Sequence, residues 1–167
     1  LVNLGHSVTV IDKFDFSRSS LNHLRYFKNF NLIFGDIRSK NLLKKHIKNK
    51  DIIIPLAALV GAPLCAKKPK QAIETNCTTI KNLVSFLNKK QKIIFLTTNS
   101  GYGVGEKNKF CDESSELRPV SLYGRTKNEA EKYVCKHKNY VSFRLATVFG
   151  YSYRMRTDLL VNNFTLK

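Results

Sequence analysis

Apolar and polar residues are arranged along the chain in two kinds of segment. Short runs rich in β-branched and aromatic residues are typical of strands that are buried on both faces. Longer stretches place apolar residues three and four positions apart, which is typical of amphipathic helices. We expect strands at residues 8–11, 32–34, 52–54, 93–96 and 141–145. We expect helices at residues 20–30, 39–48, 70–88 and 121–137.

Apolar strands separated by helix-length connections predict a parallel sheet covered by helices on both faces. The expected fold class is therefore α/β, a doubly wound parallel sheet with right-handed crossovers. Residues 1–5 resemble the last turn of a helix that ends at Gly5. A helix before the first visible strand implies an earlier strand, so we expect the sheet to have begun before Leu1.

Length and composition restrict the class of protein further. The chain has 167 residues, 43% of them hydrophobic, which suffices for the core of one ordinary domain and excludes disorder as the main state. The longest apolar run, residues 51–60, is interrupted by Pro55 and is shorter than the roughly 18 residues that cross a bilayer. The N-terminus also lacks the pattern of a secretory signal peptide. We therefore expect a cytoplasmic protein with no membrane partner.

The formal net charge of +17 raises the question of a nucleic acid or another anionic partner. The positive residues are mostly lysines scattered near expected helix ends, and no zinc-finger spacing, aromatic RNA-binding signature or arginine-rich arm accompanies them. We expect solvated faces and no nucleic-acid partner. The cysteines are spaced neither as a metal site nor as a redox pair, so we expect reduced thiols and no metal: Cys65, Cys77, Cys111 and Cys135.

Candidate chemistry lies near the fourth expected strand. Tyr123 and Lys127 stand four residues apart in an expected helix and share one face. Because an ammonium beside a phenol favours the phenolate, we expect the pKa of Tyr123 to fall from about 10 towards neutrality. Such a tyrosine can remove a proton from a substrate hydroxyl while a hydride leaves the same carbon. Thr98 ends a strand at the edge where open α/β sheets bind ligands, and it can hold that hydroxyl.

Two aspartates follow earlier strands. Asp12 closes the first visible strand, where an acidic residue accepts hydrogen bonds from an adenosine ribose in nucleotide-binding βαβ units. Its charge repels a 2′-phosphate and thus favours NAD over NADP. Asp36 follows the next strand and can contact adenine. Both aspartates are also ordinary turn residues.

With these residues in view, the chain resembles the extended short-chain dehydrogenases/reductases of the NAD-dependent epimerase/dehydratase family, which act mainly on nucleotide sugars. The resemblance covers nearly all 167 residues. Thr98, Tyr123 and Lys127 match the family's catalytic Ser/Thr, Tyr and Lys in order and spacing. Pro55 departs from the family, which often has His there. The other segments that resemble it are 5–12, 51–58, 74–77, 144–150 and 154–163.

The resemblance implies the site residues and the domain organisation. The catalytic residues would be Thr98, Tyr123 and Lys127. The cofactor NAD would be bound by these last two and by Asp12, Lys13, Asp36, Ile37, Leu56, Ala57, Ala58 and Asn76. The substrate would meet Asn99, Ser100, Asn162 and Asn163. Residues 1–150 would form a partial NAD-binding Rossmann-like domain and residues 151–167 the start of a substrate-binding region, in a full-length protein that is a homodimer.

The residues after Thr98 narrow the expected reaction. Family dehydratases resemble Thr-Asp-Glu here, decarboxylating members have a Glu two places after the Thr, and a 3,5-epimerase has a Cys at that place. Asn99 and Ser100 supply none of these groups. Oxidation and return of a hydride at one carbon remain, and we expect an NAD-dependent, epimerase-like enzyme acting on a nucleotide sugar. The alternatives are an NAD(P)-dependent reductase of another small carbonyl substrate and a non-catalytic protein that binds a dinucleotide or a polyanion.

None of the eight glycines supplies the family's G-x-x-G-x-x-G turn, which places backbone N–H groups against a pyrophosphate. The family's first strand, at the centre of its sheet, is missing with it. We therefore expect a fragment of a longer protein, in which strands 8–11 and 52–54 have no shared neighbour and expose backbone edges. The isolated polypeptide should bind NAD poorly and show no turnover.

Overall fold

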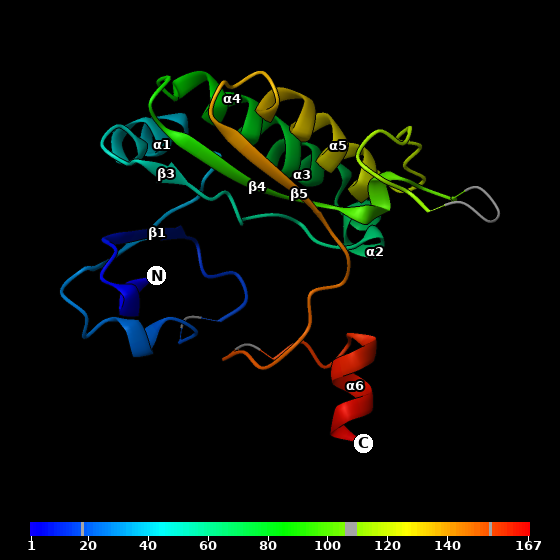
Figure 1. The fold of residues 1–167 in the computed structure, drawn as a ribbon. Helices are drawn as coiled ribbons and strands as arrows, with labels where there is room; N and C mark the ends of the chain where they lie inside the picture. Colours follow the sequence, from blue (N-terminus) through cyan, green and yellow to red (C-terminus); the bar gives the residue numbers. More distant parts are fainter. Residues whose placement is uncertain (18, 106–109, 154) are drawn as a thin grey trace. The chain divides into compact units, whose positions relative to one another are not determined.

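The structure is a computed structural model that describes residues 1–17, 19–105, 110–153 and 155–167. Its described residues divide into two compact units, which Figure 1 colours along the sequence. The first unit comprises residues 1–36 and 147–167, and the second comprises residues 37–146. All pairings between the described strands are parallel, so the expected α/β class is confirmed.

The first unit contains a two-stranded sheet. Strand β1 (Val8–Asp12) pairs with β2 (Phe30–Phe34), and Asp12 lies opposite Phe34 at the carboxyl ends of the two strands. The short 3-10 helix η1 (Val2–Leu4) precedes β1 and ends at Gly5, whose φ of 84° is left-handed. The expected helical turn before the first strand is thus confirmed. Helix α6 (Leu160–Leu166) completes this unit.

The helix expected at residues 20–30 is wrong. Only the 3-10 helix η2 (Asn22–Leu24) forms there, and β2 already begins at Phe30. Asn29 explains the difference, because its Nδ2 donates to the carbonyl oxygens of Val2 and His6 at 2.9 Å each. These contacts hold the end of the segment beside the N-terminal turn and align the next residue with β1. Tertiary hydrogen bonds here override a helical pattern that is weak in local terms.

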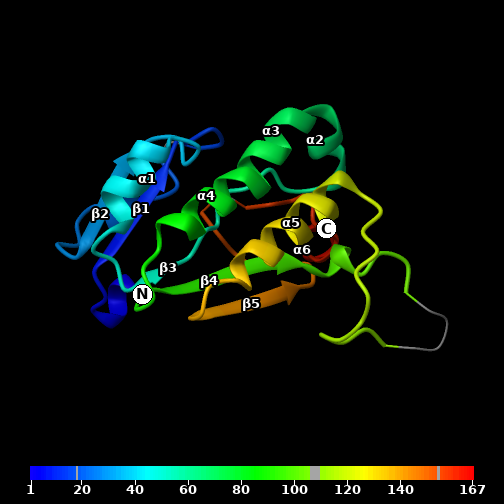
Figure 2. The same cartoon turned by 90° about the horizontal axis from the view of Figure 1, so that it is seen from above.

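The second unit contains a three-stranded sheet in the order β3 (Ile52–Ile53), β4 (Lys92–Thr98) and β5 (Tyr140–Leu145). Helix α1 (Lys40–Ile47), helix α3 (Pro69–Ile73), helix α4 (Thr79–Phe86) and helix α5 (Leu122–Val134) lie on one face of this sheet (Figures 1 and 2). The π-helical segment η3 (Glu74–Thr78) joins α3 to α4, so the expected long helix is confirmed with an irregular middle. Helix α2 (Ala62–Lys67) precedes α3 and was not expected.

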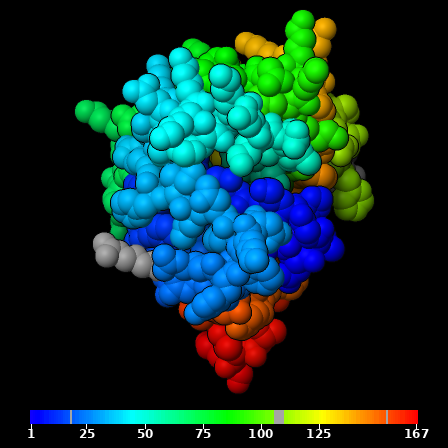
Figure 3. All heavy atoms as spheres, turned by 90° about the vertical axis from the view of Figure 1, so that its left-hand side faces the viewer, coloured from blue at the N-terminus to red at the C-terminus, as the bar shows by residue number. Residues whose placement is uncertain are grey.

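The core of the second unit fills the layer between this sheet and its helices. Its buried apolar residues come from α1, β3, α4, β4 and α5 at the periodicities that the sequence predicts: Leu43, Ile47, Ile53, Ile80, Leu83, Ile93, Phe95, Ala130 and Val134. The polar side of α1, in cyan in Figure 3, lies at the surface of this unit. Ser39 and Ser121 cap α1 and α5, since their side chains accept hydrogen bonds from Leu42 N and Gly124 N.

The two sheets remain separate among the described residues. β1 pairs only with β2, and β3 pairs only with β4. Among the described residues no strand pairs with both β1 and β3, and the expected missing strand stays a prediction.

A buried glutamine joins the turns at the amino ends of the second unit's strands. The Gln91 side chain donates through Nε2 to the carbonyl oxygens of Ile47 and Lys50 at 2.7 and 2.6 Å. Its Oε1 accepts from Asn88 N, and its own backbone carbonyl contacts His137 Nε2 at 2.7 Å. One residue, 3% exposed, therefore holds the turns before β3, β4 and β5 together.

Replacing this residue should destabilise the fold. Gln91→Ala removes the Nε2 donor that the carbonyl oxygens of Ile47 and Lys50 share, and we expect a loss of about 2 kcal/mol in the free energy of unfolding. Urea denaturation measures the loss, with Lys89→Ala as the control because Lys89 is exposed in the same turn. Equal stability of the two variants would contradict the assigned role of Gln91.

Candidate active site

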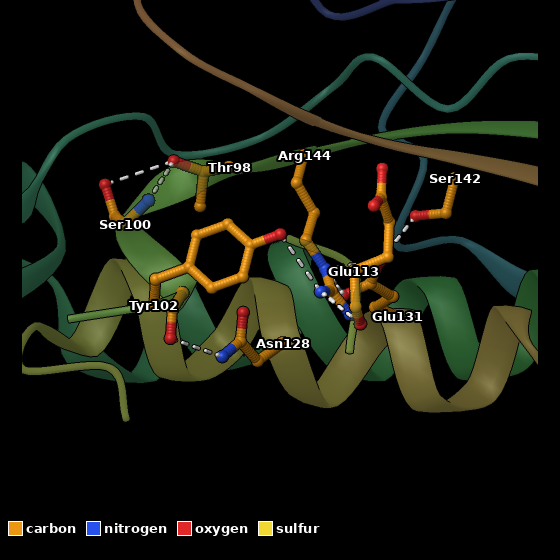
Figure 4. A network of polar contacts seen from close by, with 9 residues as sticks. Thr98, Ser100, Tyr102, Glu113, Asn128, Glu131, Ser142 and Arg144 are labelled. Carbon is orange, nitrogen blue, oxygen red and sulfur yellow. Dashed lines mark hydrogen bonds and ion pairs between the residues drawn. The ribbon is translucent and has the colours of Figure 1, made fainter. Parts of the chain in front are cut away.

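The carboxyl end of β4 carries the first candidate residue. Thr98 is buried, and its Oγ1 accepts from Ser100 N at 3.2 Å and donates to Ser100 Oγ at 3.1 Å (Figure 4). These bonds start the 3-10 helix η4 (Asn99–Gly101), which turns the chain away from the sheet. Asn99 and Ser100, in this turn, are exposed. The strand end therefore presents hydroxyl and amide groups and no carboxylate at these two positions.

Helix α5 brings the second candidate to the same place. Tyr123 lies in its first turn, close enough to Thr98 for the Thr98 hydroxyl to act on the pKa of the phenol. Gly124 permits this closeness, because a Cβ atom there would lie 2.9 Å from the Ser100 carbonyl oxygen and 3.0 Å from Pro119 Cβ. The predicted meeting of Thr98 and Tyr123 is therefore present in the structure, and it depends on a glycine that sequence reasoning did not consider.

The expected direction of the Tyr123 pKa is wrong for the chain in this structure. Burial raises the pKa of Tyr123, the nearby Cys65 adds to the rise, and the Thr98 hydrogen bond opposes it. Burial disfavours the charged phenolate. Lys127 is not among the groups that shift this pKa, and its Nζ lies 4.3 Å from the centre of the Phe95 ring. Tyr123 is consequently a protonated phenol at neutral pH.

Lys127 is a buried lysine, 5% exposed, in the middle of α5. Burial lowers its pKa from 10.5 to about 8, and the carboxylate of Glu131 opposes this shift. Among the described residues its ammonium has no hydrogen-bond acceptor, and its contact is the face of Phe95. The ammonium can therefore donate to a hydroxyl group that comes from outside the chain.

This burial makes stability depend on pH. Between about pH 8 and 10.5 the unfolded chain holds a proton on Lys127 that the folded chain has lost, so stability rises with pH in this window. Lys127→Met removes this pH dependence. Relative to this variant, the wild type should gain about 2 kcal/mol in the free energy of unfolding between about pH 7 and pH 9.5. Urea unfolding at both pH values tests this. The exposed Lys132→Met is the control, and a parallel response of all three proteins would contradict it.

Asn76 has a structural role that the sequence did not reveal. Only 1% exposed, it accepts from Leu59 N at 2.8 Å and donates to Leu59 O at 2.9 Å. Its Nδ2 also reaches Thr126 Oγ1 on α5 at 3.4 Å. The π-helical turn of η3 places this amide so that it fixes the loop after β3. Its predicted contact with a cofactor stays a prediction.

The loop that Asn76 fixes carries three further candidates. Leu56 and Ala57 are exposed and Ala58 is half-buried between β3 and α2. Leu59, the next residue, is buried beside Cys65 and Ala72. The loop is thus anchored at its far end while residues 56–58 remain accessible for a ligand.

A network that sequence reasoning missed lies one helical turn beyond Lys127. Glu131 accepts from Ser142 Oγ at 2.7 Å and from Arg144 Nε at 3.2 Å (Figure 4). Arg144 in turn donates from Nη1 to the Tyr102 hydroxyl at 3.2 Å. The spacing of Lys127 and Glu131, four residues apart, was the available signal, since such residues share a helix face.

The first unit gathers a separate set of candidates at the carboxyl ends of its strands. Asp12 is exposed, and its Oδ1 accepts from Phe14 N at 2.7 Å, which closes a tight turn. The ammonium of Lys13 lies 2.7 Å from Asp15 and 3.7 Å from Asp36. Lys13 and Asp36 are thus close together beyond the carboxyl ends of β1 and β2, and the predicted contacts of Asp12, Lys13 and Asp36 with a cofactor stay predictions. Ile37, the next residue, begins the second unit.

The predicted substrate-binding asparagines belong to α6. Asn162 is 3% exposed and uses both ends of its amide on the backbone, accepting from Gly150 N and donating to Arg156 O. Asn163 donates to Thr157 O at 3.1 Å. Asn162 therefore shapes the segment before α6, and a substrate contact of either residue stays a prediction. Arg154, in the segment that resembles the family, lies outside the described residues.

Two further classes of site were searched in the same ranges. No group of three or more His, Cys, Asp or Glu side chains in the described chain could hold a metal ion. No described helix is both long and apolar enough to cross a membrane. The cysteines are all free.

The chain is similar in sequence and in structure to several known proteins. Residues 1–166 match the model of the NAD dependent epimerase/dehydratase family. A UDP-N-acetyl-alpha-D-glucosaminuronate decarboxylase of Bacillus cytotoxicus is 31% identical over 138 residues, 81% of this chain and 41% of the relative. A UDP-glucuronic acid 4-epimerase of Bacillus cereus, crystallised with UDP-glucuronic acid and NAD, superposes with a TM-score of 0.80 at 26% identity, over 96% of this chain and 54% of that one. The enzyme WbmH of Bordetella bronchiseptica, crystallised with NAD+, gives a TM-score of 0.78 at 26% identity over 89% and 50%.

The chain therefore belongs to the NAD-dependent epimerase/dehydratase family. The resemblance expected from the catalytic spacing is confirmed at the level of the family and of its Rossmann-like fold. The chain spans about half of these solved structures, and less of the decarboxylase. Its relatives include epimerases, dehydratases and a decarboxylase, so the family alone leaves the reaction open.

Proposed function

We propose that the protein carrying this chain is an NAD-dependent, epimerase-like enzyme that acts on a nucleotide sugar. The observation that carries the proposal is the placement of Thr98 at the carboxyl end of β4, close to Tyr123 in the first turn of α5, with the buried ammonium of Lys127 one turn further along the same helix. Relatives that are crystallised with NAD or with nucleotide sugars support the choice of cofactor and substrate class.

The residues fit a nicotinamide cofactor. Lys127 has a buried ammonium that can donate to a ribose hydroxyl, and residues 56–58 form an accessible loop beside the same helix end. In the first unit, Asp12 ends its strand with an exposed carboxylate that can accept from an adenosine ribose. NAD, when bound, supplies the hydride acceptor and donor for the sugar carbon.

The chain's own residues then transfer the proton. Thr98 holds the reacting oxygen of the sugar by a hydrogen bond, and Tyr123 exchanges the proton with that oxygen. Because burial raises the pKa of Tyr123, the phenol is protonated at neutral pH, which is the form that can donate a proton to a keto oxygen. It acts as the base only when a positive charge approaches it. Lys127, four residues further along α5, can supply that charge from the same helix face.

The absence of carboxylates beside Thr98 favours epimerase-like chemistry over elimination. Asn99 and Ser100 are exposed and neutral where a dehydratase needs an acid and a base. Neither side chain can remove a proton from the carbon next to the oxidised one. The proposed reaction therefore ends with the hydride returned to the carbon that lost it.

Removing the phenol tests the proposal. We expect Tyr123→Phe, in the protein that carries this chain, to lower kcat by at least about 100-fold while NAD binding persists, because only the proton-transferring hydroxyl is lost. Tyr133→Phe on the same helix is the matched control, since that ring stacks under lysines away from Thr98. Turnover of UDP-sugars such as UDP-glucuronic acid can be followed by NMR. Unchanged kcat in Tyr123→Phe would refute the catalytic assignment and favour a non-catalytic dinucleotide-binding protein.

A second candidate is a one-way reductase of a carbonyl substrate. The raised pKa of Tyr123 favours it, since a protonated phenol is the proton donor that a reduction needs. The two reactions differ in their use of cofactor. An epimerase leaves the NAD concentration unchanged over many turnovers, whereas a reductase consumes one NADH per product. Absorbance of NADH during turnover decides between them.

A further inference from the structure

A carboxylate is buried inside the second unit, next to the proposed catalytic residues. Glu131 is 6% exposed on α5, and its oxygens accept hydrogen bonds from Ser142 and Arg144 of β5. Figure 4 shows it beneath Arg144, with Ser142 on its other side. A carboxylate at this depth is costly unless it is both paired and hydrogen-bonded. Both conditions are met here, by Arg144 and by Ser142.

Arg144 links this carboxylate to the turn after Thr98. Its Nη1 donates to Tyr102 Oη at 3.2 Å and to the Glu113 carbonyl oxygen at 3.3 Å, and its guanidinium lies 5.3 Å from the centre of the Tyr102 ring. Tyr102 directly follows η4. The turn that carries Asn99 and Ser100 is therefore held at its far end by β5.

The same turn is also held by α5. Asn128, the residue after Lys127, donates to the Gly101 carbonyl oxygen at 3.3 Å. A Cβ atom at Gly101 would collide with the Asn128 side chain. Hydrogen bonds from α5 and β5 thus hold η4, the turn that follows Thr98. Lys127 and Glu131 lie on the same face of α5.

We propose that Glu131 is a positioning residue for Lys127, and that its ion pair with Arg144 couples this ammonium to the turn after Thr98. The proposal rests on the proposed function above, which makes Lys127 a ligand of the cofactor. Glu131 lies one helical turn from the ammonium and keeps it charged inside the core. Arg144 keeps the carboxylate in place and aligns Tyr102. Neither residue has to touch the substrate.

Charge balance explains why the carboxylate is needed. Lys127 and Arg144 are two cations with side chains largely removed from water, and Glu131 pairs with Arg144 one helical turn away from Lys127. Burial lowers the pKa of Lys127, and Glu131 is the group that opposes this effect. Without the carboxylate, Lys127 would lose its proton more readily.

Other titratable groups surround α5, but Glu131 is the charged group that acts on the Lys127 pKa among the described residues. Cys65 raises the pKa of Tyr123. Glu129 raises the pKa of Cys77, and Lys81 lowers it. The titratable groups on α5 and on the elements packed against it are Cys65, Lys67, Lys70, Glu74, Cys77, Lys81, Lys92, Tyr123, Arg125, Glu129, Glu131, Lys132, Tyr133, Tyr140 and Arg144.

Glu131→Gln is the test, because glutamine keeps an oxygen for Ser142 and Arg144 and loses only the charge. We expect the pKa of Lys127, measured by NMR titration of its 13Cε signal and assigned with Lys127→Arg, to fall by about 1 unit or more. If Lys127 works as an ammonium, the alkaline limb of kcat should move to lower pH by the same amount. Glu129→Gln is the matched control on this helix, since Glu129 pairs with Lys132 on the surface.

A second variant should shift the pKa of Lys127 in the opposite direction. Arg144→Gln removes a cation from the network, so the pKa of Lys127 should rise, whereas a purely structural disturbance gives no such reversal between the two variants. An unchanged Lys127 titration in Glu131→Gln, or shifts of the same sign in both variants, would overturn the proposal. If Glu131→Gln does not fold, the Arg144→Gln titration alone decides, with a rise supporting the proposal and any other result overturning it.

These measurements separate the two proposals. The NMR titration needs neither NAD nor substrate, so opposite shifts support the positioning role even if Tyr123→Phe leaves turnover unchanged. Conversely, loss of turnover in Tyr123→Phe together with an unchanged Lys127 titration in Glu131→Gln would keep the proposed function and reject the role of Glu131.

Discussion

Close packing of α5 against the carboxyl end of β4 is the constraint on which the candidate site depends. Gly124 allows the first turn of the helix to approach the Ser100 carbonyl, and Gly101 allows the turn after Thr98 to approach Asn128. The helix consequently buries Lys127 above Phe95 and brings Tyr123 to Thr98. A side chain larger than hydrogen at Gly124 would force these two elements apart. The chemistry of the site therefore begins with van der Waals contact between backbones.

That packing has an electrostatic consequence. A lysine, a glutamate and an arginine are drawn into a region with little water, where each unpaired charge would be expensive. The chain balances them by hydrogen bonds from Ser142 and Arg144 to Glu131, while Lys127 keeps a lowered pKa. Tyr123 responds to the same burial with a raised pKa. One cause, removal from water, thus pushes the phenol and the ammonium towards their neutral forms.

The family relationship and the site agree about the class of chemistry while leaving the reaction open. Relatives within the family include decarboxylases, dehydratases and epimerases. They share the Rossmann-like scaffold, so their differences have to reside in side chains near the reacting carbon. In this chain those positions hold Asn99 and Ser100, which have neither the acid nor the base that elimination requires. The reaction proposed here follows from what these two side chains cannot do.

Sequence patterns predicted the strands well, since each is a short apolar run whose periodicity is a local property. They also predicted α1, α5 and the order of Thr98, Tyr123 and Lys127, because spacing along a helix is fixed by its geometry. They failed at residues 20–30, where hydrogen bonds from Asn29 to the N-terminal turn decide the conformation. They also missed α2 and the π-helical turn of η3.

The amino-acid sequence was thus sufficient for the α/β class, the family and the identity of the candidate residues. Tertiary structure alone decided the direction of the Tyr123 pKa, the structural role of Asn76 and the network of Glu131, Arg144 and Tyr102. The physical reason is common to all three. Burial and hydrogen bonding between residues far apart in the chain depend on distances in space, and a pattern of neighbours along the chain does not contain them.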